Sequence, residues 1–357
     1  MTSNSTNSID EKKLNEFMLK AIGDISSSMS AMLVIIGERL GLYKAMAKSG
    51  PVTSNELAKK TNTAERYIRE WLANQAAGGY IIYNPNDQTF FLPPEQAVVL
   101  ADENSSVYIQ GAYQVIKSLF KDEEKFLDMF LTGKGLRWGD HHHDLFEGTA
   151  RFFKPNYVGN LVSTWIPSLD GIQEKLEEGA KVADIGCGFG ISTILMAKAF
   201  PNSVVYGFDN HIPSIEEAKK QALNEGLEEN VKFIVNSSTE TFGNDFDLIT
   251  FFDCLHDMGD PVGVLKIVKK SLKPDGVCMI IEPKANDRVE DNLNLVGRTF
   301  YAGSTLVCVP NSLYYNGPAL GAQAGEQKIK EITELAGFTK LRIASSTPFN
   351  NVYELKM

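Results

Sequence analysis

The chain has 357 residues, 43% of them hydrophobic and 22% charged, which is the balance of a soluble globular protein long enough for two domains. Its formal charge of −10 disfavours nucleic acid and anionic membranes as partners. The first ten residues lack the apolar run of a secretory signal and no apolar run reaches the length of a membrane span, so we expect a cytoplasmic protein. The four cysteines have neither zinc-site nor disulfide spacing.

Residues 11–47 are predicted to be helical, because apolar side chains recur at steps of three and four along one face. This apolar stripe consists of Ile22, Ile25, Met29, Met32, Ile36 and Leu40. Two interpretations are open. The stripe packs onto the chain's own core, or it forms an interface of paired helices in a dimer.

Residues 53–92 follow the order of a winged helix-turn-helix. A capping box at Thr53 and Glu56 begins the first helix, residues 64–75 form the second, and two alternating segments form a β-hairpin. Within this segment four basic side chains are balanced by four acidic ones. A helix that reads DNA needs a positive surface, so we expect no binding to nucleic acid.

Residues 101–178 read as a helical connector that also serves as a substrate lid. A glycine-containing break at 132–135 is followed by three consecutive histidines, residues 141–143. Neighbouring residues do not share one face of a strand or a helix, so a substrate-facing loop is favoured over a metal site, and no metal is expected. The residues of this segment predicted to line the substrate site are Trp138, His142 and Tyr157.

A short apolar run that contains Asp184 is predicted to be a strand. It is followed by glycines at every second position, namely Gly186, Gly188 and Gly190. Glycine permits positive φ and leaves no Cβ between the backbone and a ligand, and the helix predicted to follow points its N-terminus at that ligand. A dinucleotide motif needs its third glycine one residue later, where Ile191 stands, so NAD is disfavoured. Asp184 suits a ligand with an ammonium group, which S-adenosylmethionine carries.

Polar residues also follow the next three predicted strands, at 204–209, 231–235 and 246–252. Asp209 can accept hydrogen bonds from ribose hydroxyls, and the polar run at 236–238 lies where an adenine ring would bind, although turn residues alone would explain that run. The residues predicted to bind the cofactor are Asp184, Gly186, Cys187, Gly188, Gly190, Asp209, Asn210, Asn236, Ser237, Ser238 and Asp253.

The glycine loop after Asp184, the later Asp209 and the segment LKPDG at 272–276 together resemble the class I S-adenosylmethionine-dependent methyltransferases over residues 179–357. Asp275 departs from the glycine that usually ends the last motif. The resemblance implies S-adenosyl-L-methionine as the cofactor. It also implies a seven-stranded, doubly wound Rossmann-like α/β sheet with an antiparallel last strand.

The N-terminal segment resembles the dimerisation domain of many small-molecule O-methyltransferases, in which the winged helix is architectural and closes the substrate pocket. The resemblance implies a homodimer held by the N-terminal helices. It also implies three parts: a helical winged-helix domain at 1–100, a connector and lid at 101–178, and a methyltransferase domain at 179–357.

His256 lies in a segment that resembles the Leu-His-Asp-Trp-x-Asp motif of plant and microbial O-methyltransferases, in which the histidine takes a proton from a hydroxyl. Met258 stands where that motif has tryptophan. An unperturbed imidazole pKa of ~6.5 suits a general base near neutrality. A histidine at a strand-to-helix turn can equally serve only to cap or pack.

Residues 283–325 form a long connection at the strand edge that faces the ligand, and such connections are usually functional. Its tyrosines predicted to line an aromatic substrate pocket are Tyr301, Tyr314 and Tyr315. The sequence therefore predicts methyl transfer to a hydroxyl of a small molecule, with His256 as base. Two alternatives stay open: an S-adenosylmethionine-binding regulatory or DNA-binding protein, and a methyltransferase that acts on nitrogen or carbon.

Overall fold

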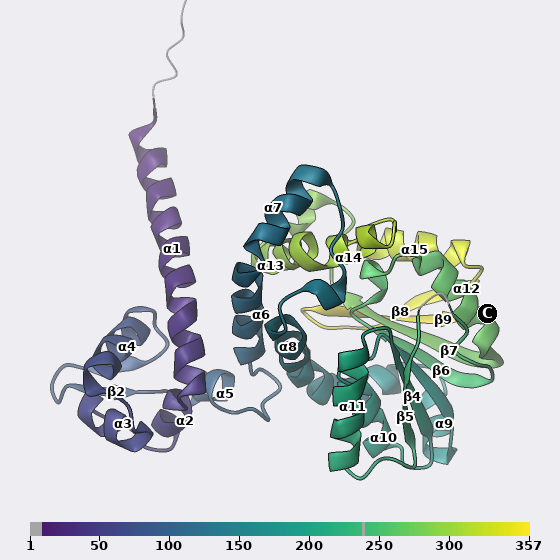
Figure 1. The fold of residues 1–357 in the computed structure, drawn as a ribbon, viewed down its shortest axis with the longest axis horizontal. Helices are drawn as coiled ribbons and strands as arrows, with labels where there is room; N and C mark the ends of the chain where they lie inside the picture. The colour runs from purple at the N-terminus through teal and green to yellow at the C-terminus, as the bar shows by residue number, and fades with distance from the viewer. Residues whose placement is uncertain (1–8, 238–239) are drawn as a thin grey trace, which may run out of the picture. The chain divides into compact units, whose positions relative to one another are not determined.

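The computed structural model describes residues 9–237 and 240–357 and divides into two compact units, residues 1–117 and 118–357. The division falls within helix α6 (Gln110–Lys121), so the predicted connector is shared between the units. The first unit is mainly helical, and the second is built on a large sheet (Figure 1). The predicted boundaries near residues 100 and 178 stay predictions.

The first unit has the predicted winged-helix order. A capping box between Thr53 and Glu56 begins the first of the two short helices, as expected. The prediction of a single helix over residues 11–47 was wrong. Gly41 takes a φ of 68°, which a continuing right-handed helix does not allow. The elements are α1 (Glu11–Arg39), α2 (Leu42–Ala47), α3 (Ser54–Thr61), α4 (Glu65–Ala77), β1 (Ile82–Asn84), β2 (Thr89–Phe91) and α5 (Pro94–Leu100).

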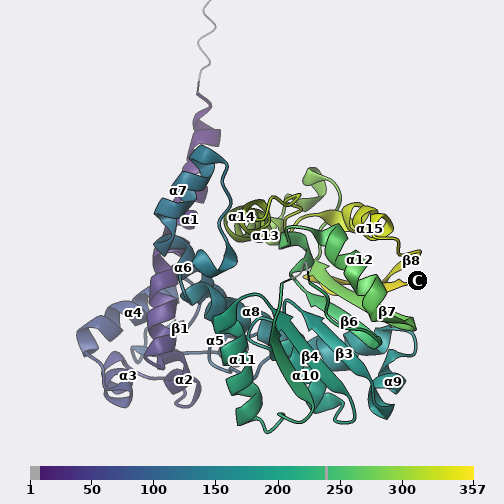
Figure 2. The ribbon, with the colours of Figure 1, turned by 45° about the vertical axis from the view of Figure 1, so that its right-hand side comes forward.

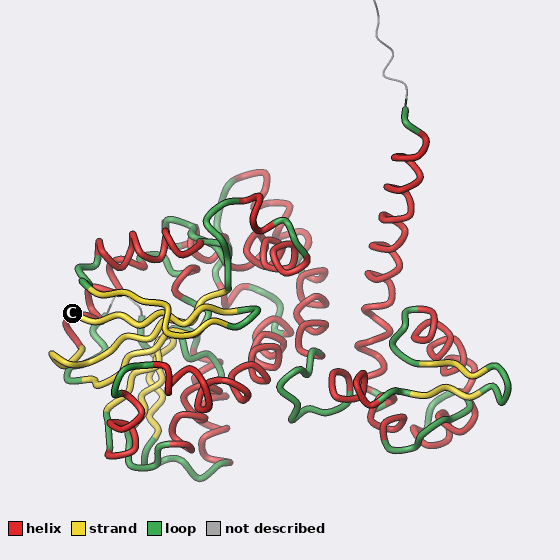
Figure 3. Tube along the Cα trace, turned by 180° about the vertical axis from the view of Figure 1, so that it is seen from behind, coloured by secondary structure: helices red, strands yellow, loops and turns green. Residues whose placement is uncertain are grey.

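The C-terminal part of α1 packs against α4. A Cβ on Gly37 would lie 2.6 Å from the ring of Trp71, so only glycine allows the two helices to approach this closely. The core of this unit also contains Val34, Leu42 and Leu57, all of them buried. The N-terminal part of α1 extends beyond the short helices of the unit (Figure 3).

The apolar stripe of α1 is exposed in the described chain. Its side chains are between 38% and 73% exposed, so the stripe does not pack onto the core of its own unit. By length and composition alone α1 could also cross a membrane, which the sequence analysis did not expect. However, Ala31, Val34, Ile35 and Gly37 are buried in its own unit, so this part of the helix already packs against protein.

The second unit contains the predicted seven-stranded sheet, in the order β5-β4-β3-β6-β7-β9-β8. The first five of these strands are parallel, and β9 pairs antiparallel with both β7 and β8. The strands are β3 (Lys181–Ile185), β4 (Val204–Asp209), β5 (Val231–Val235), β6 (Phe246–Phe252), β7 (Leu272–Pro283), β8 (Lys340–Ser346) and β9 (Asn350–Lys356).

Helices cover both faces of this sheet (Figure 2), as the apolar runs of buried parallel strands require. One core lies between the sheet and α9 (Ile172–Glu178), α10 (Ile191–Ala199) and α11 (Ile212–Asn224). The other lies beneath α12 (Pro261–Ser271) and α15 (Gly325–Leu335). The chain passes from β3 to β4 on one side of β3 and later returns to β6 on its other side. Ligands are therefore expected at the carboxyl ends of these strands.

The remaining helices of the second unit precede the sheet or lie in the long connection after β7. Helix α11 begins at Ile212, and the hydroxyl of Ser214 in its first turn bonds with Nδ1 of His211 at 2.7 Å. The connection is helical rather than irregular. These elements are α7 (Glu123–Thr132), η1 (Trp138–Asp140), α8 (Asp144–Asn160), η2 (Leu161–Trp165), η3 (Ile166–Ser168), η5 (Val289–Asn292), α13 (Leu295–Gly303), η6 (Ser304–Cys308) and α14 (Val309–Tyr314). In addition, the short η4 (Leu255–Asp257) follows β6.

Candidate functional site

The three glycines of the loop after β3 all take positive φ, but only one of them faces open space. A Cβ on Gly186 would lie 2.8 Å from Cys254 Sγ, and one on Gly190 would lie 2.5 Å from the ring of Phe233. At Gly188 a Cβ would meet nothing within 4 Å. The outer glycines therefore allow close packing, and Gly188 is where a ligand can approach the backbone. The side chain of Cys187 is buried, so this residue can offer a ligand little beyond its backbone.

Asp184 is fully buried and hydrogen-bonded within the protein. Its carboxylate accepts from the hydroxyls of Ser192 and Thr193, both at 2.6 Å, and from Thr250 at 3.1 Å. Burial raises its pKa to about 6, although these hydrogen bonds oppose the rise. Asp184 therefore fastens the start of α10 to the sheet. Its direct contact with a cofactor stays a prediction.

Asp209 holds the glycine loop from the neighbouring strand. Its Oδ2 accepts from the backbone N–H of Gly188 at 2.9 Å, and its Oδ1 accepts from that of His211 at 2.8 Å. Burial raises the pKa of this carboxyl. Each carboxylate oxygen keeps a second lone pair, which suits the hydroxyls of a ribose. Asn210 is exposed and hydrogen-bonds with the side chain of Tyr315.

After β5, Asn236 lies against the same strand end. Its backbone N–H donates to the carbonyl of Asp209 at 2.9 Å. Its Oδ1 is buried and has no hydrogen-bond partner among the described residues. Ser237 is half-buried beside it, and Ser238 lies outside the residues that the structure describes. A buried acceptor without a donor, next to Asp209, fits a ligand with an exocyclic amine, as adenine has.

Asp253, directly after β6, takes a φ of 51°, which is rare for a residue other than glycine. Its carboxylate accepts from the Tyr157 hydroxyl at 3.2 Å and from Asn350 Nδ2 at 2.7 Å. Burial first, and then the charge of Glu282, raise the pKa of Asp253 to about 7. The structure therefore brings Tyr157, predicted from its position alone, to the predicted cofactor site.

His256 is paired with a residue that the sequence analysis missed. Its Nδ1 pairs with the carboxylate of Glu282 at the end of β7, and its backbone N–H donates to Glu282 Oε1 at 3.2 Å. Burial disfavours the imidazolium, but the charge of Glu282 and further hydrogen bonding outweigh it and raise the pKa of His256 well above its usual value. Its pKa is therefore not the unperturbed one that we expected. Glu282 ends a strand as Asp184 and Asp209 do, and that signal could have identified it.

Asn311 on α14 joins two loops of the site. Its Nδ2 donates to the carbonyl of Asp257 at 3.0 Å, and its Oδ1 accepts from the backbone N–H of Trp138 at 2.9 Å. The loop that carries Trp138 is thereby tied to the loop that carries His256. Burial raises the pKa of Asp257 to about 7. Asn311 has no sequence signal, since nothing in its spacing marks it.

Two of the three tyrosines predicted in the long connection lie together. The rings of Tyr314 and Tyr315 meet edge to face at 5.0 Å, and their side chains are 46% and 43% exposed. Tyr315 reaches Asn210 and so borders the predicted cofactor residues. Tyr301 is half-buried on α13, and none of the contacts found among the described residues joins its side chain to this pair.

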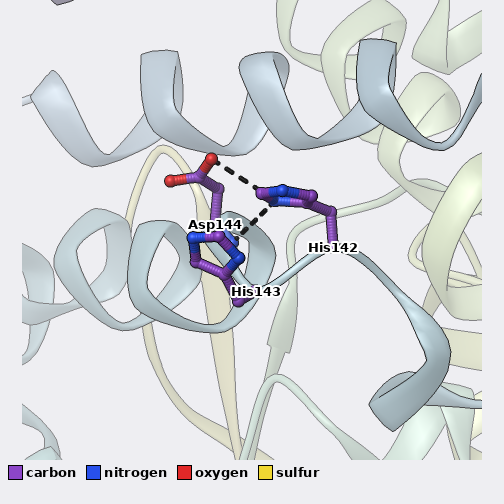
Figure 4. Close-up of side chains that lie close together, drawn as sticks. All are labelled: His142, His143 and Asp144. Carbon is purple, nitrogen blue, oxygen red and sulfur yellow. Dashed lines mark hydrogen bonds and ion pairs between the residues drawn. The ribbon is translucent and has the colours of Figure 1, made fainter.

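Two of the three consecutive histidines, His142 and His143, form a separate group with Asp144 (Figure 4). His142, His143 and Asp144 each offer one ligand atom, and these atoms lie within 4.8 Å of one another. However, the ammonium of Lys121 lies 3.1 Å from His142 Nε2 and 3.3 Å from Asp144 Oδ2. A cation of the protein's own already occupies this position, so the geometry gives no support for a metal. The substrate contact expected of His142 stays a prediction.

Two family models match the chain. Residues 176–337 match a methyltransferase domain, and residues 28–102 match an Rv2258c-like winged helix-turn-helix domain. The ubiquinone biosynthesis O-methyltransferase of Actinobacillus pleuropneumoniae is 36% identical over 132 residues, which are 35% of this chain and 53% of that protein. The chain thus spans about half the length of the curated relatives it matches.

Solved structures resemble the chain over almost its whole length. Mitomycin 7-O-methyltransferase is 20% identical, with a TM-score of 0.68 over 97% of this chain and all of that one. Human N-acetylserotonin methyltransferase, solved in complex with S-adenosylmethionine, is 15% identical, with a TM-score of 0.67 over 99% of both chains. At these identities the likeness shows the fold alone. By these matches, its fold and its glycine loop, the chain carries an S-adenosylmethionine-dependent methyltransferase domain at residues 176–337, preceded by a winged helix-turn-helix domain at residues 28–102.

Proposed function

We propose that this protein transfers a methyl group from S-adenosylmethionine to a hydroxyl of a small molecule. The observation that carries the proposal is the buried pair of His256, on the loop after β6, and Glu282, at the end of β7, at the carboxyl edge of the sheet. A bound S-adenosylmethionine would supply an activated methyl group. The protein then has to align the acceptor and remove its proton.

The residues around the glycine loop suit this cofactor. Asp209 would accept from the ribose hydroxyls, Asn236 from the adenine amine, and the open backbone at Gly188 would lie against the ligand. Asp253 and Asp257, with pKa values raised to about 7, make the site favour a cation. The ligand's ammonium and sulfonium groups would offset the repulsion that Glu282 exerts on both carboxyls.

His256 would act as the general base. Glu282 fixes the ring through Nδ1 and stabilises the positive charge that develops when the imidazole takes a proton. Because the pKa of His256 is raised, the ring becomes neutral, and able to act as a base, at a higher pH than an ordinary imidazole does. A regulatory protein that merely binds the cofactor would have no use for a buried acid that orients a histidine.

The winged helix is proposed to be architectural. Both basic side chains of α4 are already paired along the same helix, Arg66 with Glu70 at 2.6 Å and Arg69 with Glu65 at 2.8 Å. This face is therefore close to neutral and offers DNA phosphates little attraction. The exposed apolar stripe of α1 instead suits a second copy of the chain, so we propose a homodimer.

A metabolite extract treated with the protein and S-adenosylmethionine carrying an isotopically labelled methyl group tests the function. Mass spectrometry of the labelled product, followed by NMR, identifies the atom that received the methyl. We expect a methyl ether or ester. A product methylated on nitrogen or carbon would replace this proposal with the second alternative. If the cofactor bound but no product formed in any extract, the regulatory alternative would gain support.

A further inference from the structure

Asn350, at the start of β9, joins three parts of the candidate site, and its side chain is buried, with 1% of the residue exposed. Its Nδ2 donates to Asp253 Oδ1 at 2.7 Å and to the backbone carbonyl of Glu282 at 3.4 Å. Its Oδ1 accepts from the Nδ2 of Asn156 on α8 at 2.7 Å. One neutral amide thus connects α8 and the end of β7 with the loop after β6.

The turn before β9 fixes the backbone of Asn350. Its N–H donates to Thr347 Oγ1 at 2.9 Å, and its carbonyl accepts from the N–H of Thr347 at 2.8 Å. The N–H of Lys284 donates to the carbonyl of Phe349 at 2.7 Å, which fastens the turn to the end of β7. The backbone of Asn350 is therefore held from both sides, next to Asp253.

A chain of three asparagines fixes which way each amide faces. The Nδ2 of Asn160 donates to the backbone carbonyl of Asn156 at 2.9 Å and to Asn156 Oδ1 at 2.8 Å. Because a carbonyl can only accept, Asn160 has to present its Nδ2 here, and Asn156 its Oδ1. The Nδ2 of Asn156 then faces Asn350 Oδ1, which turns the Nδ2 of Asn350 toward Asp253. The bond to the carbonyl of Glu282 requires the same orientation.

Both oxygens of the Asp253 carboxylate meet donors. Oδ1 accepts from Asn350, and Oδ2 accepts from the Tyr157 hydroxyl at 3.2 Å. Burial, and then the charge of Glu282, favour the protonated carboxyl, whereas the charge of His256 and the two donors favour the ionised one. These opposing influences leave the pKa of Asp253 at about 7. Without one of the donors, the carboxyl would be protonated at neutral pH.

We propose that Asn350 is a positioning residue that keeps Asp253 ionised and in place for the positive charge of S-adenosylmethionine, with Asn156 as its support. This role rests on the contribution to cofactor binding proposed above for Asp253. Asn350 acts through that carboxylate, so the effect of removing its amide on cofactor affinity should depend on pH and on the presence of Asp253.

Calorimetry of S-adenosylmethionine binding to the wild type and to Asn350→Leu, between about pH 6.5 and 9, tests this role. Leucine has a similar volume but no donor. A hydrogen bond to a charged group corresponds to about one pKa unit or more. We therefore expect the variant to bind about five- to tenfold more weakly than the wild type at pH 7, and within about twofold of it at pH 9. The ratio of the two dissociation constants at each pH cancels the titration of the ligand's own amine.

Asn351→Leu is the matched control. Asn351 is the next residue of β9 and is also buried, but its amide bonds with the hydroxyls of Tyr353 at 3.3 Å and Ser346 at 2.8 Å. We expect its affinity to match that of the wild type at every pH. Asp253→Asn should bind more weakly above pH 7, and adding Asn350→Leu to that variant should change its affinity by less than about twofold.

A deficit of the same size at every pH in Asn350→Leu, or no deficit, would overturn the proposal. If this variant does not fold, Asn156→Ala replaces it and should show a smaller deficit that again disappears at alkaline pH, whereas a flat ratio would count against the role of Asn350. Unchanged affinity in Asp253→Asn would remove Asp253 from the site, and the role of Asn350 with it. No acceptor is present, so none of these results depends on methyl transfer.

Discussion

The carboxylate of Glu282 holds His256 at two points, pairing with Nδ1 of the ring and accepting from the histidine's backbone N–H at 3.2 Å. Both side chains are only 4% exposed, so the ring has little freedom to turn. The remaining edge of the imidazole is therefore the part that can meet an acceptor.

The pH dependence of turnover should show that His256 works as a base with a raised pKa. A base acts only when deprotonated, so kcat/KM should rise with pH through the pKa of His256, above the usual value of ~6.5. Glu282→Gln removes the charge that stabilises the imidazolium, so the acidic limb of the profile should move to lower pH. An acidic limb that stays in place in this variant would show that Glu282 does not tune the base.

Asp209 should be required for cofactor affinity but not for folding. We expect Asp209→Ala to weaken S-adenosylmethionine binding by about 1.5–3 kcal/mol, the range for hydrogen bonds to a charged group. Isothermal titration calorimetry measures the change, and thermal unfolding tests the fold. Asp275→Ala is the control. Asp275 lies near the start of β7, and its exposed carboxylate pairs with Lys175. Equal affinities in the wild type and Asp209→Ala would remove Asp209 from the site.

Cofactor affinity should increase with pH around neutrality. In the unliganded protein, burial keeps the pKa values of Asp253 and Asp257 at about 7, so both carboxyls are partly protonated there. A cationic ligand favours their ionised forms. Affinity should therefore fall as pH drops below 7, by up to about tenfold per pH unit for each group. Above pH 7 the affinity should level off. Calorimetry between about pH 6 and 8 in the wild type and in Asp253→Asn checks this, and the variant should have the shallower slope. A flat profile in the wild type would mean that no proton is released on binding.

The sheet could be predicted from the sequence because each strand is a short apolar run with a polar residue at its carboxyl end. The strands 204–209, 231–235 and 246–252 have the predicted bounds. Side-chain contacts between segments that are distant in the sequence could not be predicted. No local pattern brings Asn311 to Trp138, or Asn350 to Asp253, because these contacts depend on how the connection after β7 and the β8–β9 turn fold back.

The sequence also left the role of the α1 stripe open, since periodicity predicts an amphipathic helix but not what its apolar face contacts. The exposure of Ile25 and Met29 favours a dimer. The double variant Ile25→Asp and Met29→Asp should dissociate it, because each change places a charge in the interface. Ser27→Asp is the control, on the opposite side of the helix. Light scattering that found the wild type monomeric, or the double variant still dimeric, would contradict the proposed interface.

The most direct test of methyl transfer with a histidine base compares His256→Ala with the wild type on the identified acceptor. General-base catalysis typically contributes about 100- to 10,000-fold, so turnover near neutral pH should fall on that scale while the affinity for S-adenosylmethionine barely changes. If His256→Ala instead retained full turnover of the same hydroxyl, the acceptor would ionise unaided, and the pair of His256 and Glu282 would be structural only.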